Sequence, residues 1–132
     1  MGIELKLLLD THALLWWWND DERLSTRAAS AISDEGNTVI VSAASAWEIA
    51  TKHRLGKLLG GERATLQFSE LIEADGFSHL AIAYQHAIKA GGFTVEHRDP
   101  FDRMLAAQSI LERVTLVTND AAMKSLGAKC YW

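Results

Sequence analysis

Two kinds of hydrophobic pattern alternate along the chain: short unbroken apolar runs, and longer stretches with apolar residues every three or four positions. The runs predict buried strands and the longer stretches predict amphipathic helices. The predicted strands cover residues 5–9, 39–42, 79–82, 115–118 and 128–131. The predicted helices cover residues 11–18, 25 to the turn at 34–37, 43–56, 62–75, a segment ending at 91–92, a segment beginning at 100 and a short one from 119.

The regular alternation of strand and helix predicts an α/β fold, in which a central parallel sheet is covered by helices on both faces. With 132 residues, the chain is long enough for one hydrophobic core and too short for two. We therefore expect a single domain over residues 1–132. In sheets of this kind, ligands bind at the carboxyl ends of the strands, where the strand order reverses.

Composition narrows the functional classes. The chain is 48% hydrophobic and 23% charged, which is typical of a globular protein in water. Its formal net charge of −4 argues against a protein that coats nucleic acid by bulk electrostatics, but it allows local contacts to phosphates. The single cysteine, Cys130, permits no internal disulfide, and the apolar segment 5–18 is too short and too polar for a signal peptide or a membrane span. We expect a cytoplasmic protein with no membrane association.

Four acidic residues are candidates for a site at the strand ends. Asp10 ends the first predicted strand, and Asp120 directly follows the fourth. Glu48 lies about one and a half turns into the helix after the second strand, and Asp102 lies in the opening turn of the helix that begins at residue 100. Each has a simpler explanation as a helix cap, and Ser45 with Glu48 has the spacing of a capping box. Together they would meet at one end of the sheet, where clustered carboxylates resist ionising unless a cation neutralises them. Oxygen ligands suit Mg²⁺ or Mn²⁺, which activate water for attack on phosphorus. The pattern therefore predicts a metal-dependent phosphodiesterase.

The segment HRDPFDRML, at residues 97–105, contains the only proline of the chain. A polar residue before proline begins a helix, because the proline ring pre-sets φ and has no N–H to leave unpaired. Asp99 and Pro100 are therefore predicted to start a helix, which leaves Asp102 free to face a metal.

Four segments, DTHALLWW, VSAASAWEIATKHRLGKL, HRDPFDRMLAAQ and VTND, resemble the PIN-domain nucleases, in particular the VapC toxins of bacterial toxin–antitoxin pairs. The resemblance extends from about residue 5 to residue 132, with the blocks in the expected order and spacing. It implies a three-layer α/β/α sandwich with strand order 3-2-1-4-5. The family's acidic positions fall on Asp10, Glu48 and Asp102, and Asp120 corresponds to a fourth, more variable one.

The resemblance also implies an activity and partners. It points to a Mg²⁺- or Mn²⁺-dependent endoribonuclease that acts on structured RNA, with transfer RNA favoured as the substrate, and that is inhibited by a cognate VapB-type antitoxin. The family tends to form homodimers. Trp16, Trp17 and Trp18 span too wide an arc of a helix for one core face, so at least one indole should lie at a surface suited to a partner.

Several alternatives remain open at the level of sequence. A PIN fold used only for RNA binding would keep the fold without catalysis. A phosphoacceptor receiver domain is excluded, because none of the later strands ends in the required aspartate or lysine. Thr11 and Thr118 either orient the acids or are structural. Six basic residues are candidates for phosphate contacts or for a solvated surface: Lys52, His53, Arg54, Lys57, Arg98 and Arg103.

Overall fold

The computed structural model describes residues 3–58 and 60–132. Its centre is a five-stranded, fully parallel sheet with the order β3-β2-β1-β4-β5. The strands are β1 (Lys6–Leu9), β2 (Thr38–Ser42), β3 (Ser78–Leu80), β4 (Thr115–Val117) and β5 (Cys130–Tyr131). This confirms the predicted α/β class and the strand order that the family resemblance implied.

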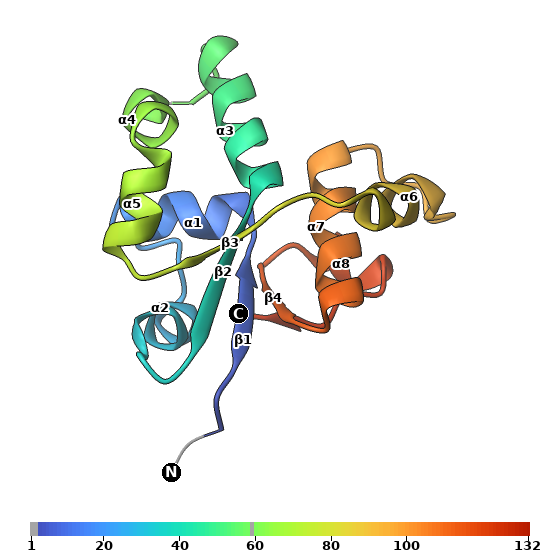
Figure 1. The fold of residues 1–132 in the computed structure, drawn as a ribbon, viewed down its shortest axis with the longest axis horizontal. Helices are drawn as coiled ribbons and strands as arrows, with labels where there is room; N and C mark the ends of the chain where they lie inside the picture. Colours follow the sequence, from blue (N-terminus) through green and yellow to red (C-terminus); the bar gives the residue numbers. More distant parts are fainter. Residues whose placement is uncertain (1–2, 59) are drawn as a thin grey trace.

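Helices cover both faces of the sheet (Figure 1). On one side lie α1 (Thr11–Trp18), α2 (Thr26–Ser33) and α5 (Phe68–Ala74), and on the other lie α6 (Tyr84–Gly92), α7 (Pro100–Glu112) and α8 (Ala121–Ser125). The remaining helices, α3 (Ala43–Arg54) and α4 (Gly61–Leu66), rise beyond the carboxyl ends of the strands. No helix in the described ranges combines the length and apolar character needed to cross a membrane.

The central strand β1 shows why this sequence builds two cores. Successive side chains of a strand point to opposite faces of the sheet. Leu7 and Leu9 pack into the core beneath α1, α2 and α5, while Leu8 packs into the core formed with α7 and α8. All three leucines are fully buried, as expected for a parallel strand covered on both faces.

Three predicted elements differ from the structure, and the last strand is one of them, because it begins at Cys130 and not at residue 128. The single helix expected at 62–75 is two helices, α4 and α5, which meet at Gln67 (φ −115°, ψ 21°). The break lets α4 pack against α3 while α5 packs beside β3, which one straight helix could not do. The third strand ends at Leu80 and not at residue 82, because Leu80 pairs with Ser42, the last residue of β2.

Local backbone chemistry sets two helix ends, the second of them as predicted. Gly76 follows α5 with φ +71°, a left-handed conformation that favours glycine. Asp99 caps α7, since its carboxylate accepts hydrogen bonds from the backbone N–H groups of Phe101 (2.9 Å) and Asp102 (3.2 Å), with Pro100 as the first helical residue.

Candidate metal-dependent active site

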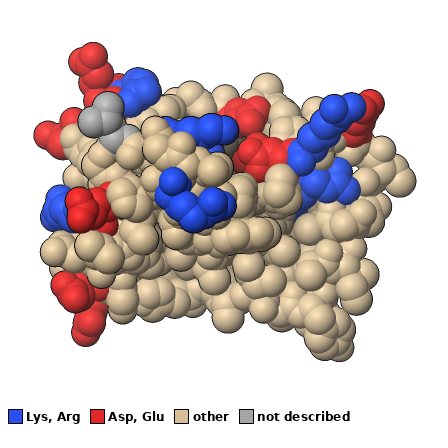
Figure 2. All heavy atoms as spheres, turned by 90° about the horizontal axis from the view of Figure 1, so that it is seen from above, with Lys and Arg blue, Asp and Glu red and all other residues tan. Residues whose placement is uncertain are grey.

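The four predicted acids are positioned by elements that leave the carboxyl edge of the sheet. Asp10 follows β1, Asp120 follows β4, Glu48 lies on α3 directly after β2, and Asp102 lies in the first turn of α7. The strand order reverses between β2-β1 and β4-β5, so this edge is the topological switch point. Figure 2 shows the molecule from this end: acidic side chains lie in the middle of the face, with Lys or Arg side chains on both sides.

Asp10 has two roles in the structure. It caps α1, because its Oδ1 accepts the Ala13 N–H at 2.7 Å. It is also 95% buried, and burial raises its pKa to about 6, although hydrogen bonds from the Thr118 hydroxyl and the Ala13 N–H act in the opposite direction. A carboxyl group that only capped a helix would normally be exposed, so the capping explanation does not account for its burial.

Glu48 does not form the capping box that its spacing suggested. α3 is capped by Ser42, whose hydroxyl accepts the Ala44 N–H, and Ser45 is buried in the helix interior, where its hydroxyl accepts a hydrogen bond from Thr11 at 3.0 Å. The Glu48 side chain is 3% exposed and forms an ion pair with Lys52 one turn later. A buried carboxylate is costly without a cation partner, and Lys52 supplies that partner here.

Asp102 is half-buried, and its Oδ2 lies 3.0 Å from Nε2 of His97. Burial raises the pKa of Asp102, the hydrogen bond with His97 lowers it, and the neighbouring charges of Asp99 and Glu48 raise it. Asp102 in turn raises the pKa of Asp10. The charge of Glu48 therefore acts on Asp102, and the charge of Asp102 acts on Asp10.

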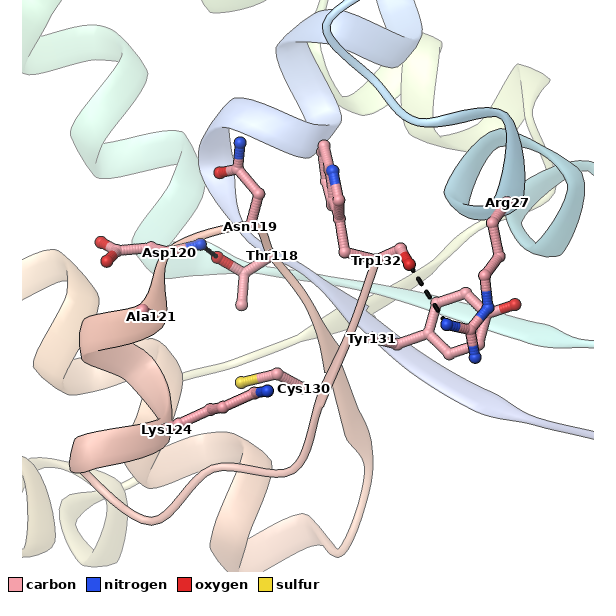
Figure 3. Close-up of a pocket in the computed structure, with 9 residues that line it drawn as sticks. All are labelled: Arg27, Thr118, Asn119, Asp120, Ala121, Lys124, Cys130, Tyr131 and Trp132. Atoms are coloured by element: carbon pink, nitrogen blue, oxygen red, sulfur yellow. Dashed lines mark hydrogen bonds between the residues drawn. The ribbon is translucent and has the colours of Figure 1, made fainter.

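Asp120 is the exposed member of the four and caps α8, with its Oδ1 accepting the Ala122 N–H at 2.9 Å. It borders a pocket of about 320 Å³ at the ends of β4 and β5 (Figure 3). In this pocket Lys124 and Cys130 point toward one another. Burial raises the pKa of the Cys130 thiol, the charge of Lys124 lowers it, and the charges of Asp10 and Asp120 raise it.

The donor set fits a hard divalent cation in its chemistry. All of its donors are carboxylate oxygens, which are the ligands such ions prefer. The pKa values of Asp10 and Asp102 are raised because both carboxylates are buried and face other negative charges. Within residues 3–58 and 60–132, however, no three His, Cys, Asp or Glu side chains converge tightly enough to hold a metal. Glu48 and Asp102 instead contact Lys52 and His97, so these contacts would have to open around an ion.

Two of the six basic candidates are explained internally. Arg103 donates hydrogen bonds to the carbonyls of Ala90, Phe93, Val95 and His97, and so secures the segment that leads into α7. Lys52 neutralises Glu48. The role of His97 could not be predicted from the sequence, because only the fold of this segment places it against Asp102. The Glu48–Lys52 pair carried a detectable signal, the i, i+4 spacing of opposite charges on a helix.

Trp16, Trp17 and Trp18 are all partly buried against the core under α1. The indole N–H groups of Trp17 and Trp18 both donate to Asp75 Oδ2, at 3.2 and 2.9 Å. Trp16 packs edge-on against Trp132, with ring centroids 5.8 Å apart. Each indole thus keeps some surface, as predicted for at least one of them, while also serving the fold.

The parallel sheet of this order, with acidic residues gathered at its switch point, defines an α/β protein with an anionic edge. The sequence matches the PIN domain over residues 7–129, and the chain therefore belongs to the PIN-domain family. Over 55 residues it is 38% identical to ribonuclease VapC16 of Mycobacterium tuberculosis (strain ATCC 25618 / H37Rv), a stretch covering 42% of this chain and 39% of that protein. The aligned part is less than half of that relative's length.

Solved structures share the fold over nearly the whole chain. VapBC2 from Rickettsia felis, bound to a DNA fragment from its promoter, matches with a TM-score of 0.69 and 15% identity, covering 96% of this chain and 98% of that one. VapBC-1 from nontypeable Haemophilus influenzae matches with a TM-score of 0.69 and 14% identity, covering 96% and 97%. At these identities the likeness shows the fold alone. The resemblance to PIN domains and VapC toxins that the four sequence segments indicated is confirmed by these matches together.

Proposed function

We propose that the protein is a Mg²⁺- or Mn²⁺-dependent endoribonuclease of the VapC toxin type, acting in the cytoplasm. One observation carries the proposal: Asp10 and Glu48 are buried at the switch point with the half-buried Asp102 beside them, and the pKa values of Asp10 and Asp102 are raised there. A capped helix explains one oxygen of Asp10 and nothing of Glu48 or Asp102.

Asp10, Glu48 and Asp102 would hold the ion, with Asp120 as a fourth ligand. When bound, the ion would supply an activated water and charge stabilisation at the phosphorus. The chain's own residues prepare the site. Thr118 holds the Asp10 carboxylate by a hydrogen bond, and Lys52 keeps the buried charge of Glu48 compensated before the ion enters.

Cleavage of RNA by the purified protein tests this proposal. Products are mapped by sequencing RNA ends, in Mg²⁺ or Mn²⁺ and then in excess EDTA, with Asp10→Asn as the inactive comparison. We expect cleavage that stops in EDTA, resumes when the ion is restored and disappears in the variant. Cleavage that persists in EDTA contradicts the metal-dependent mechanism. RNA binding without cleavage in either ion favours the alternative, a PIN fold used only for binding. Total RNA as substrate also tests whether transfer RNA is the target.

We further propose that a small VapB-type antitoxin covers the protein near α1. Trp16 and Trp17 line a surface hollow of about 530 Å³ whose rim also carries the acids Asp20, Asp21 and Glu22, which suits a partner segment with both an apolar and a basic side chain. Trp16→Ala should weaken the complex by about 2 kcal/mol or more if this indole is an anchor. The variant is compared with the parent by calorimetric titration with the product of a neighbouring small open reading frame. Equal affinity contradicts the proposal.

The homodimer is proposed on a different surface. Ile82, Tyr84 and Ile88 expose 37%, 72% and 70% of their surface at and before α6, which leaves apolar side chains facing outward. Sedimentation of the parent and of Ile88→Lys tests the dimer. A parent that is monomeric at high concentration contradicts it.

A further inference from the structure

Two aromatic side chains meet beside the acids, one from each helix that carries an acid. Trp47 directly precedes Glu48 on α3, and Phe101 directly precedes Asp102 on α7. Their ring centroids lie 4.5 Å apart at an interplanar angle of 74°, an edge-to-face contact. The two rings therefore bridge α3 and α7 next to the proposed catalytic carboxylates.

Trp47 differs from the other tryptophans in its exposure. All five lie in the described part of the chain, and only Trp47 is exposed, with 53% of its surface accessible, whereas Glu48 beside it is 2% exposed. Successive residues of a helix point about 100° apart, so the indole stands on the solvent side of the buried acid. A large apolar side chain left open beside a reactive site is better explained by a ligand than by the core.

We propose that Trp47, supported edge-on by Phe101, is the platform on which an unpaired base of the RNA stacks during cleavage. The inference rests on the proposed function and adds a positioning residue to it, one that can act only where the RNA base is unpaired. Trp47 is a positioning residue, because it holds the base and leaves the reacting phosphate to the acids.

The chemistry of this face favours a nucleobase over other occupants. The acids repel the RNA backbone, so part of the affinity must come from contacts that do not depend on charge. Stacking of a base on an aromatic side chain provides such a contact for any base, and a typical platform changes affinity about tenfold or more. The lysine and arginine side chains on both sides of the acids (Figure 2) can hold phosphates on either side of the stacked base. RNA whose bases are paired cannot use this platform.

A double-mutant cycle between the protein and the RNA tests the proposal. Binding is measured by fluorescence anisotropy in the Asp10→Asn background, so that the RNA stays intact, with an unstructured RNA of about ten nucleotides. Each position of this RNA is replaced in turn by an abasic site. The parent protein is compared with Trp47→Leu, Trp47→Phe and the control Leu111→Ala, which removes another exposed apolar side chain near the far end of α7.

We expect Trp47→Leu to weaken binding about tenfold and Trp47→Phe to retain most of the affinity. An abasic site at one position should weaken binding to the parent about tenfold and leave binding to Trp47→Leu unchanged, because the two changes remove the same contact. Leu111→Ala should have no effect on RNA binding. Additive losses, or a Trp47→Leu variant that binds every RNA as the parent does, overturn the proposal.

The same variants also test whether a second copy of the chain or an antitoxin covers Trp47 instead of RNA. If Trp47→Leu alters self-association or antitoxin binding while RNA affinity is unchanged, the aromatic pair is a protein interface and the proposal is wrong. Failure of the proposed function would look different. Parent protein with intact acids would then cleave no RNA, while the coupling between Trp47 and the abasic position would remain. Cleavage with purely additive binding losses would reject the stacking platform alone.

Discussion

The buried carboxyl of Asp10 leads to a stability prediction that needs no RNA. Burial raises its pKa from 3.8 to about 6, so at neutral pH the folded protein holds an ionised group that would be better solvated in the unfolded chain. This pKa difference lowers the free energy of unfolding by about 3 kcal/mol at neutral pH. Asp10→Asn removes the charge and keeps an oxygen that can accept the Ala13 N–H, because asparagine caps helices as well as aspartate does. The metal-free variant should therefore be more stable than the parent.

The sign of the effect depends on pH in a defined way. Below pH 3.8 the carboxyl is protonated in both states and Asp10 carries no penalty. As the pH rises from 3.8 to about 6, the unfolded chain ionises first and the parent loses stability, and above about pH 6 the penalty is constant. Allowing for a weaker hydrogen bond to Thr118, we expect the variant to gain about 1 to 3 kcal/mol near pH 7.5, and the gain to shrink toward zero near pH 4.

Urea unfolding followed by circular dichroism, in EDTA and at several pH values, measures this difference. Asp120→Asn is the matched control, because it makes the same chemical change at an exposed cap and should show no such gain. Added Mg²⁺ should then stabilise the parent and have much less effect on Asp10→Asn. A variant that is less stable than the parent at neutral pH, or a gain that does not change with pH, would refute the argument from burial.

Three further predictions concern other parts of the molecule. Glu48→Gln and Asp102→Asn should each lower RNA cleavage more than about 100-fold with an unchanged circular dichroism spectrum, because loss of a group that only supports a metal ligand already costs about 10- to 100-fold. Asp120→Asn should lower cleavage less. Normal cleavage by folded Asp102→Asn would contradict the proposed role of Asp102. Arg103→Ala should lower the free energy of unfolding by about 2 to 4 kcal/mol in urea titrations, and lysine should not restore it, because one ammonium cannot reach the carbonyls that the guanidinium contacts. The buried Ser42 hydroxyl donates a hydrogen bond to the side-chain carbonyl of Gln108 on α7. Gln108→Leu removes this acceptor and should lower the free energy of unfolding by about 1 to 3 kcal/mol in the same assay. An unchanged urea midpoint would show that the contact contributes nothing to stability.

Much of the fold could be predicted because its signals are local. Apolar runs such as residues 5–9 can be buried only as strands between two helical layers, and Asp99 with Pro100 sets a helix start by backbone chemistry alone. The break at Gln67 could not be predicted, because it depends on which neighbours α4 and α5 pack against. The end of β3 depends likewise on where its partner strand β2 ends.

The candidate site also has features that the sequence alone predicts and features that depend on packing. The sequence by itself placed Asp10, Glu48 and Asp120 at or shortly after strand ends, which a parallel sheet brings to one edge, whereas Asp102 lies in the first turn of a helix that follows another helix. Only the tertiary structure decided how deeply each acid is buried and what it contacts: Asp10 and Glu48 are enclosed, Asp120 is exposed, and His97 lies against Asp102. Trp47 shows the limit most clearly, since the sequence drew attention to the three tryptophans of α1, whereas the exposed indole stands on α3. Burial and contacts across elements depend on how distant segments pack, and periodicity along one segment carries no information about that packing.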